Sequence, residues 1–377
     1  MNGVEYRFLE PLDVLFMRGN KLFGDPGSFG ESLIPPWPSV AAGAIRSRML
    51  ADDKVDLAEF ASDASGAIDN PSLGSPQNPG SFAVTGFYLA RRLAEAIEIL
   101  VTPPADLVIG KTDAGTLAVR RLNPTEVAGG IASSAHLPLL PVLAEARRGK
   151  PVAGYWLKQA GWIKYLNGAL PDAGDLIEAG KLWQIEPRVG VGLDADTRRA
   201  SDGKLFSMQA VAMRPDSGFL VAIRGAEPPL DGLLRFGGDG RAAAVSPAAV
   251  ELPQADYDAL LESRRCRIVL TTPGLFPEGW RLPGAGASLQ LCIGGVRARL
   301  VAAAVPRAEV VSGWDLAKGQ PKPAQRVAPA GSVYWLDDLD ATPDELRKLA
   351  ENGLWNHPCE DASRRAEGFN RFNFAAY

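Results

Sequence analysis

The first strand, loop and helix of this 377-residue chain lie in residues 4–50, which read VEYRFLEPLDVLFMRGNKLFGDPGSFGESLIPPWPSVAAGAIRSRML. Residues 4–16 predict an extended strand, interrupted at Pro11 as at a sheet edge or a bulge. Residues 18–38 hold four glycines and four prolines and predict a long ordered loop. Ser39 then stands where a helix N-cap belongs, and a helix over 39–50 is predicted with Arg46 opposite its apolar side.

The rest of the chain repeats this order of strands followed by a helix. Further strands are predicted at 82–90, 97–101, 105–109, 183–194, 204–215, 219–225, 265–273, 289–305, 332–336 and in the tail, and further helices at 152–167, 254–263 and 342–353. The pattern favours an α+β fold with helices on one face of antiparallel sheets, and the ferredoxin-like β-α-β-β-α-β unit is the natural candidate. We expect two domains, 1–205 and 206–377, and a flexible Gly/Pro/Ser-rich insertion at 62–81.

Composition narrows the classes of protein. Apolar residues make up 46% of the chain and the formal net charge is −4, so a nucleic-acid site must be a local patch. Three cysteines without a CxxC pair argue against a disulfide framework and for a reducing compartment. An acidic N-terminus unlike a signal peptide, and the lack of an apolar run of about twenty residues, predict a soluble cytoplasmic protein without membrane contact.

Several motifs suggest catalysis or cofactor binding and fail on their context. Residues 190–195 match G-x-G-x-x-A with Asp216 about twenty residues on, but the turn-rich segment that follows does not open the helix that a dinucleotide site needs. The pair His357 and Cys359 lacks zinc-ligand spacing. Three aspartates before the helix at 342–353 are more simply partners of its dipole than magnesium ligands; they are Asp337, Asp338 and Asp340.

Histidine, the commonest general base, occurs only twice. His136 stands near Ser133 and Ser134, but no nucleophile-elbow glycines surround these serines. The sequence therefore predicts no assembled active site, no metal and no cofactor.

Basic residues gather in the Gly/Pro-rich loops and in the tail, where they alternate with aromatic residues. Guanidinium and ammonium groups bind phosphates and aromatic faces stack on bases, so this mixture is typical of a single-stranded RNA site. A solvated protein face also accounts for each cluster taken alone. The clusters are Arg18, Lys21 and Arg46; Arg188, Arg198 and Arg199; Lys318, Lys322 and Arg326; and Arg364, Arg365 and Arg371 with Phe369, Phe372, Phe374 and Tyr377.

These residues resemble a known family. The opening matches "P-x-D-x-L-F-x-R" at residues 11–18, and "S-x-x-x-G-x-x-R" is present as Ser39, Gly43 and Arg46. Further matches are GYWLKQAGWIKYLNG at 154–168, EPRVGVGLD at 186–194 with RRASDGKLFSMQAVAMR at 198–214, FGGDGRAA at 236–243 and PAGSVYWL at 329–336. In this order and spacing they are similar to the Cmr subunit three family, RAMP-superfamily proteins of type III-B CRISPR effector complexes.

The resemblance implies two ferredoxin-like RAMP domains with long Gly/Pro-rich loop insertions. It implies a non-catalytic subunit that holds the 5′ tag of the CRISPR RNA (crRNA) and docks on the large polymerase-like subunit and the first backbone RAMP subunit. The family's glycine-rich loop best matches Gly368-Phe369-Asn370, where Asn370 replaces the second glycine and tolerates a positive φ better than most residues. Two alternatives stay open: a RAMP-family endoribonuclease that processes CRISPR RNA, with His136 as base, and the equivalent subunit of another type III subtype.

On this interpretation the N-terminus of the helix at 39–50 and the glycine-rich loops cradle phosphates of the tag, while basic side chains neutralise their charge. Trp37 or Phe369 stacks on a splayed base. The full predicted RNA-binding set is Arg18, Lys21, Trp37, Ser39, Arg46, Arg188, Arg198, Arg199, Lys318, Lys322, Arg326, Gly368, Phe369 and Arg371.

Overall fold

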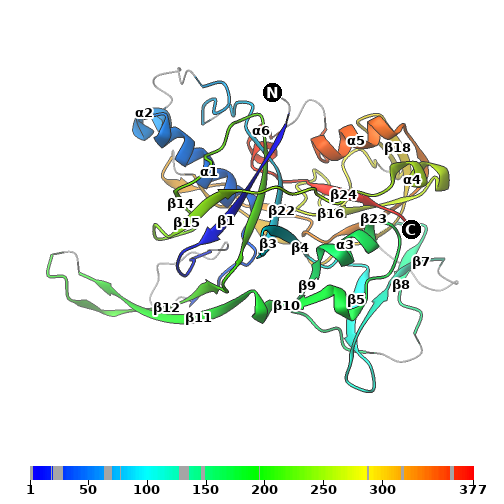
Figure 1. Cartoon of the computed structure of the whole chain (residues 1–377), viewed down its shortest axis with the longest axis horizontal. Helices are drawn as coiled ribbons and strands as arrows, with labels where there is room; N and C mark the ends of the chain where they lie inside the picture. The colour runs from blue at the N-terminus through cyan, green and yellow to red at the C-terminus, as the bar shows by residue number, and fades with distance from the viewer. Residues whose placement is uncertain are drawn as a thin grey trace.

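The structure is a computed structural model of the whole chain, built around two antiparallel sheets with helices on their faces (Figure 1). It describes residues 3–17, 19, 29–62, 70–76, 78–126, 136–145, 149–194, 196–286, 288–315, 318–356 and 361–377. Mixed helix and antiparallel sheet agree with the α+β class that the sequence predicts.

The larger sheet has eight strands, and each neighbouring pair runs antiparallel. The first strand is shorter than predicted: it ends at Pro11, which has no N–H to continue a ladder. Leu15 then bridges to Val211 in isolation. The strands, in spatial order, are β10 (Leu176–Glu178), β9 (Tyr155–Lys158), β4 (Ala96–Val101), β3 (Ala83–Leu93), β13 (Ser217–Arg224), β1 (Val4–Pro11), β15 (Ala242–Pro247) and β14 (Leu233–Arg235).

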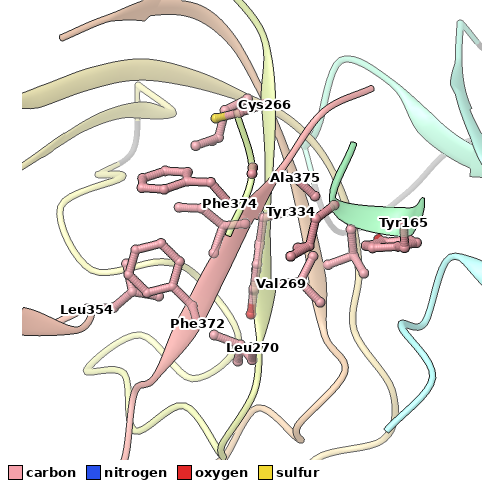
Figure 2. Packing of buried hydrophobic residues seen from close by; sticks show 14 of the residues in the cluster. Tyr165, Cys266, Val269, Leu270, Tyr334, Leu354, Phe372, Phe374 and Ala375 are labelled. Atoms are coloured by element: carbon pink, nitrogen blue, oxygen red, sulfur yellow. The ribbon is translucent and has the colours of Figure 1, made fainter. Parts of the chain in front are cut away.

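The smaller sheet has five antiparallel strands. Its apolar side chains join those of the larger sheet in one core, part of which Figure 2 shows around Tyr334, Phe372 and Phe374. The two sheets therefore share one hydrophobic core, and a second core lies between the larger sheet and α1 (Pro38–Asp52). The strands, in spatial order, are β17 (Gln290–Ile293), β18 (Val296–Ala304), β23 (Val333–Asp340), β16 (Cys266–Leu270) and β24 (Phe372–Ala375).

Four short hairpins and a long two-stranded ribbon complete the described strands. The ribbon is β11 (Trp183–Leu193) with β12 (Ala200–Met213), and it extends away from both sheets (Figure 1), with β2 (Phe29–Gly30) paired parallel to β12. Residues 190–193 of the G-x-G-x-x-A match form the end of β11 and do not start a helix, and residue 195 lies outside the described residues. The hairpins are β5 (Leu107–Lys111) with β6 (Leu117–Arg121), β7 (Asn123–Thr125) with β8 (Leu140–Val142), β19 (Glu309–Val311) with β22 (Gln325–Val327), and β20 (Trp314–Asp315) with β21 (Gln320–Pro321).

Helices α1 and α3 pack on the larger sheet, and both correct sequence predictions. Helix α1 begins one residue earlier than predicted, so Trp37 and not Ser39 is its N-cap, because Pro38 takes the first helical position where its missing N–H costs nothing. The predicted helix at 152–167 is strand β9 followed by a shorter helix α3. The α-helices are α1 (Pro38–Asp52), α2 (Leu57–Ser62), α3 (Gln159–Leu166), α4 (Tyr257–Ser263), α5 (Pro343–Asn352) and α6 (Ala362–Ala366), and short 3₁₀ turns are η1 (Ala173–Asp175) and η2 (Ala179–Lys181).

The two sheets use successive parts of the chain. The larger sheet takes its strands from residues 4–247 and the smaller from residues 266–375. The chain therefore passes from the larger sheet to the smaller between β15 and β16. The predicted domain boundary near residue 205 falls inside β12, and the division into two domains stays a prediction. In the predicted insertion 62–81, residues 63–69 and 77 lie outside the described residues, while Leu73 is fully buried in the core beside α1.

A buried polar cluster ties the smaller sheet to the loop before β5. Arg267 of β16 donates to Asp106 at 2.5 Å and to the carbonyl oxygens of Tyr165 and Ala376. The Tyr165 hydroxyl donates to the other Asp106 oxygen at 2.8 Å, and its burial, with Asp106 beside it, raises the pKa of that phenol well above its usual value. Both charged side chains are 0% exposed, so each depends on the other for its charge balance.

Candidate nucleic-acid interface

The predicted RNA-binding residues fall into three groups. Arg18 and Lys21 lie outside the described residues. A second group is buried or half-buried near the start of α1 and the end of α6, and consists of Trp37, Ser39, Arg46, Gly368, Phe369 and Arg371. A third group lies on two β structures: Arg188, Arg198 and Arg199 on the ribbon β11–β12, and Lys318, Lys322 and Arg326 on and beside the hairpins β19–β22 and β20–β21.

The two aromatic residues predicted to stack on a base are buried in a small apolar cluster. Trp37 and Phe369 pack there against Val311 of β19 and Val327 of β22. The Arg364 guanidinium lies over the Phe369 ring, 5.2 Å from its centroid. Neither ring can stack on a base in this conformation, so the stacking role predicted for them is corrected to a packing role.

The loop Gly368-Phe369-Asn370 keeps the turn expected of a glycine-rich loop. Asn370 has a φ of 59°, as the substitution of asparagine for glycine predicts. Its side-chain oxygen accepts from the Leu275 amide at 2.5 Å, and its amide donates to the carbonyls of Leu275 and Leu354. The loop is therefore closed by protein contacts, and a Cβ on Gly368 would lie 2.8 Å from Val84.

Arg371 is also a structural residue here. Its guanidinium donates to the carbonyl oxygens of Thr85 in β3 and of Ala350 and Glu351 at the end of α5. Burial lowers the pKa of Arg371 to about 10. The side chain is buried and joins the larger sheet to α5 through these three bonds, so its role in this structure is structural.

Arg46 faces the protein and not solvent. Its guanidinium donates to the Leu73 carbonyl at 2.7 Å and lies 6.0 Å from the centroid of the Phe82 ring. Burial lowers the pKa of Arg46, while the nearby Glu367 carboxylate acts in the opposite direction. The predicted place of Arg46 opposite the apolar side of α1 does not leave its guanidinium accessible, because Leu73 and Phe82 contact it there.

We therefore expect Arg46→Glu to destabilise the fold by about 3 kcal/mol, because it places a carboxylate in a desolvated site near Glu367. Arg46→Met, which keeps the apolar stem, should cost about 1 kcal/mol. Thermal unfolding of the wild-type, Arg46→Met and Arg46→Glu proteins measures this order of stability. A normal unfolding midpoint for Arg46→Glu combined with lost RNA affinity would contradict it and restore a direct phosphate contact.

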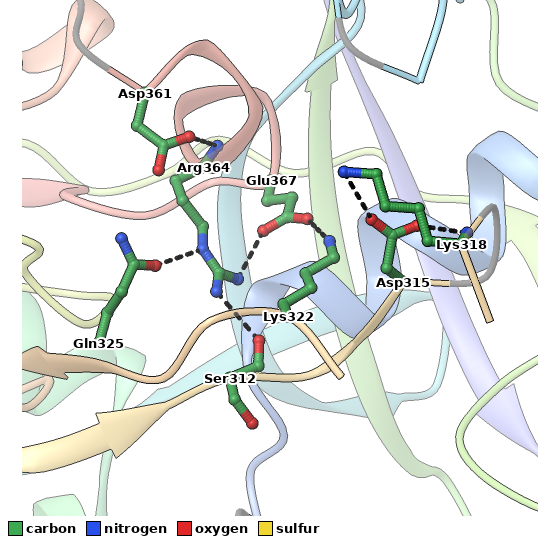
Figure 3. Close-up of polar contacts among 8 residues, drawn as sticks. All are labelled: Ser312, Asp315, Lys318, Lys322, Gln325, Asp361, Arg364 and Glu367. Carbon is green, nitrogen blue, oxygen red and sulfur yellow. Dashed lines mark hydrogen bonds and ion pairs between the residues drawn. The ribbon is translucent and has the colours of Figure 1, made fainter. Parts of the chain in front are cut away.

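A polar network holds the base of the hairpin β20–β21 against α6 (Figure 3). Glu367 accepts from Arg364 at 2.9 Å and forms an ion pair with Lys322. Arg364 also donates to the Ser312 carbonyl and the Gln325 side chain. Glu367 thus pairs with both Lys322 and Arg364 and offsets half of their combined charge, and the two side chains act as anchors.

The cations that remain accessible lie further out. Lys318 and Arg326 are exposed, and Lys318 lies 4.0 Å from Asp315 across a weak, solvated pair. On the ribbon, Arg188 pairs with Glu186 at 3.2 Å, and Arg198 and Arg199 are exposed at the tip, where Asp194 is held by Thr197. The ribbon and the hairpins β19–β22 and β20–β21 therefore present guanidinium and ammonium groups to solvent.

The candidate catalytic groups that the structure describes are paired, exposed or buried. Asp337, Asp338 and Asp340 pair with the arginines Arg265, Arg297 and Arg299. No group of three potential metal ligands occurs among the residues that the structure describes. His136 is exposed, Ser133, Ser134, His357 and Cys359 lie outside the described residues, and burial raises the pKa of the Cys266 thiol. No helix in the described part of the chain is long and apolar enough to cross a membrane.

Comparison with known proteins decides the family. The family model for CRISPR-associated protein (Cas_Cmr3) matches residues 7–372, nearly the whole chain. The chain belongs to the Cmr3 family of CRISPR-associated proteins. This confirms the resemblance inferred from the opening strand, loop and helix. No curated protein matches the sequence.

Two solved structures of Cmr assemblies contain chains similar to this Cmr3 protein. One is described as a cryo-EM structure of the type III-B Cmr-beta bound to cognate target RNA and AMPPnP, state 1; its matching chain has 14% identity and a TM-score of 0.48, with 88% of this chain and 86% of that chain covered. The other is described as the type III-B Cmr-beta bound to cognate target RNA, with 12% identity, a TM-score of 0.46, and 92% and 88% covered.

Proposed function

We propose that this Cmr3-family chain is a non-catalytic RNA-binding subunit of a cytoplasmic type III-B CRISPR effector complex. In this proposal it holds the 5′ tag of the crRNA and docks the large polymerase-like subunit onto the backbone RAMP subunits. The two sheets then correspond to two ferredoxin-like RAMP domains. Family membership supports the CRISPR assignment, and the geometry of the exposed cations supports RNA as the ligand.

One observation carries the RNA-binding proposal. On a chain with a net charge of −4, Arg198 and Arg199 are exposed at the tip of the ribbon, and Lys318 and Arg326 are exposed on the hairpins β20–β21 and β19–β22. Arginine and lysine side chains on exposed hairpins can follow a single-stranded backbone, since its phosphates are accessible from many directions. An acidic body next to these cations limits binding to the site that the cations define.

Co-purification tests this proposal. The tagged full chain is recovered from its native cells, the bound RNA is sequenced, and the bound proteins are identified by mass spectrometry. We expect short RNAs that share one 5′ tag, together with a large polymerase-like subunit. Recovery with the subunits of a different type III complex would transfer the role to that subtype, and recovery without RNA would overturn the proposal.

A further inference from the structure

Trp314 differs from the other described aromatic residues in the solvent exposure of its side chain. Among the aromatic side chains that the structure describes, it alone is exposed, at 57%, while the others are buried or half-buried. An indole ring has a large apolar surface that a folded protein usually covers. An indole left in water at the surface is therefore a candidate contact for a ligand with a flat apolar face.

The hairpin that carries Trp314 is anchored at its base. Trp314 in β20 is opposite Pro321 in β21, and the Lys322 amide donates to the Gly313 carbonyl just below that pair. Below these residues lies the Glu367 network, in which Lys322 and Arg364 hold the hairpin to α6 (Figure 3). The ring is thus presented from a fixed base, which lowers the entropy lost when a ligand binds.

The adjacent hairpin β19–β22 turns a cation outward by strand alternation. Val311 and Val327 point inward and are buried in the apolar cluster, so the intervening Val310 and Arg326, which are direct cross-strand partners, point outward. Arg326 forms no ion pair with another residue in the described part of the chain, and Lys318, in the turn after Trp314, is exposed. An aromatic face and two accessible cations therefore lie on the hairpin β19–β22 and on the hairpin β20–β21, which is nested within it.

We propose that Trp314 is a stacking platform for one unpaired base of a single-stranded RNA, with Lys318 and Arg326 binding the adjacent phosphates. This inference rests on the proposed RNA-binding function and assigns it a residue that neither the motifs nor the family match identifies. Stacking on an aromatic face accepts any base, since every base has a π-face. The flanking cations favour an anionic strand over an uncharged protein surface as the occupant.

The test uses the full chain and a fluorescein-labelled single-stranded RNA carrying the tag sequence. A set of the same RNAs, each with one abasic nucleotide, locates any base that stacks. For the unmodified RNA we expect Trp314→Ala to raise the Kd about 10-fold and Trp314→Phe to raise it about 2-fold or less. We expect one abasic position to weaken binding to the wild-type chain about 10-fold and to have no effect on Trp314→Ala.

Two further variants separate the possible failures. Leu230→Ala removes another exposed apolar side chain, 62% exposed, and should leave the Kd unchanged. Trp314→Leu keeps an apolar group without a π-face; full RNA affinity with this variant overturns the stacking inference and indicates an apolar contact. Normal RNA binding by Trp314→Ala overturns this inference alone, whereas a wild-type chain that binds no RNA overturns the proposed function as well.

Discussion

Replacing Asp106 with alanine is expected to lower the free energy of unfolding by about 3–5 kcal/mol, because the Arg267 guanidinium stays in the core without its counter-ion. The side chains of Arg267 and Asp106 are both 0% exposed, and the Arg267 Nη1 atom lies 2.5 Å from the Asp106 Oδ2 atom. Water therefore cannot replace the missing carboxylate. The Tyr165 hydroxyl loses its acceptor at the same time. Equilibrium unfolding in urea, followed by tryptophan fluorescence, measures the change.

Two comparisons give this prediction its controls. Asp340→Ala removes the carboxylate of an exposed pair, in which Arg297 is 69% and Asp340 58% exposed, and should cost less than about 1 kcal/mol. The double variant Asp106→Leu with Arg267→Met removes both buried charges and should recover most of the stability. If Asp106→Ala and Asp340→Ala lower the free energy of unfolding equally, the buried pair does not stabilise the contact between the smaller sheet and the loop before β5.

Reversing the charge of Arg188, Arg198 and Arg199 together is expected to weaken RNA binding about 100-fold, because each arginine is replaced by a repelling carboxylate. All three are exposed on the ribbon, so the fold should not change.

The salt dependence of RNA binding should also show the loss of these phosphate contacts. The slope of log K against log salt becomes shallower by about 0.7 for each single-strand phosphate that the protein no longer neutralises, or by about 2 for three phosphates. Fluorescence anisotropy with a labelled tag RNA at several salt concentrations measures both.

The matched control reverses three exposed cations elsewhere, Lys111, Arg235 and Lys348, and changes the net charge by the same amount. It should weaken binding only slightly and leave the salt slope unchanged, since long-range repulsion is screened at physiological salt. If both triple variants weaken binding equally, the ribbon is not a specific contact and the effect belongs to net charge.

Much of the fold follows from local signals in the sequence. Thr342 and Glu345 form the capping box that starts α5, as the sequence of that segment predicts. The β5–β6 hairpin turns at Gly115, where φ is positive, as its turn residues indicate. Residues 155–158 are the main exception: their helical pattern continues into α3, but pairing with β4 and β10 makes them a strand. Tertiary pairing outweighs local propensity there.

The candidate site is harder to predict because burial depends on contacts between distant segments. Trp37 lies in a Pro-rich loop, which suggests exposure, yet Val311 and Val327 cover it from nearly 300 residues along the chain. Arg46 is covered in the same way by the segment that contains Leu73. The sequence motifs do not single out Trp314 although its signal is present: it is an aromatic residue within a Gly/Pro-rich loop that also carries Lys318 and Lys322.

The central claim, that RNA contacts the ribbon and the hairpins β19–β22 and β20–β21, is tested most directly by ultraviolet crosslinking within the assembled complex. The complex is purified with its bound RNA, irradiated and digested, and the peptides of this subunit that carry nucleotides are identified by mass spectrometry. We predict crosslinks within residues 183–213 and 309–327, with Trp314 among them. Crosslinks confined to other segments, such as the exposed edge strands β14 and β17, would contradict the account.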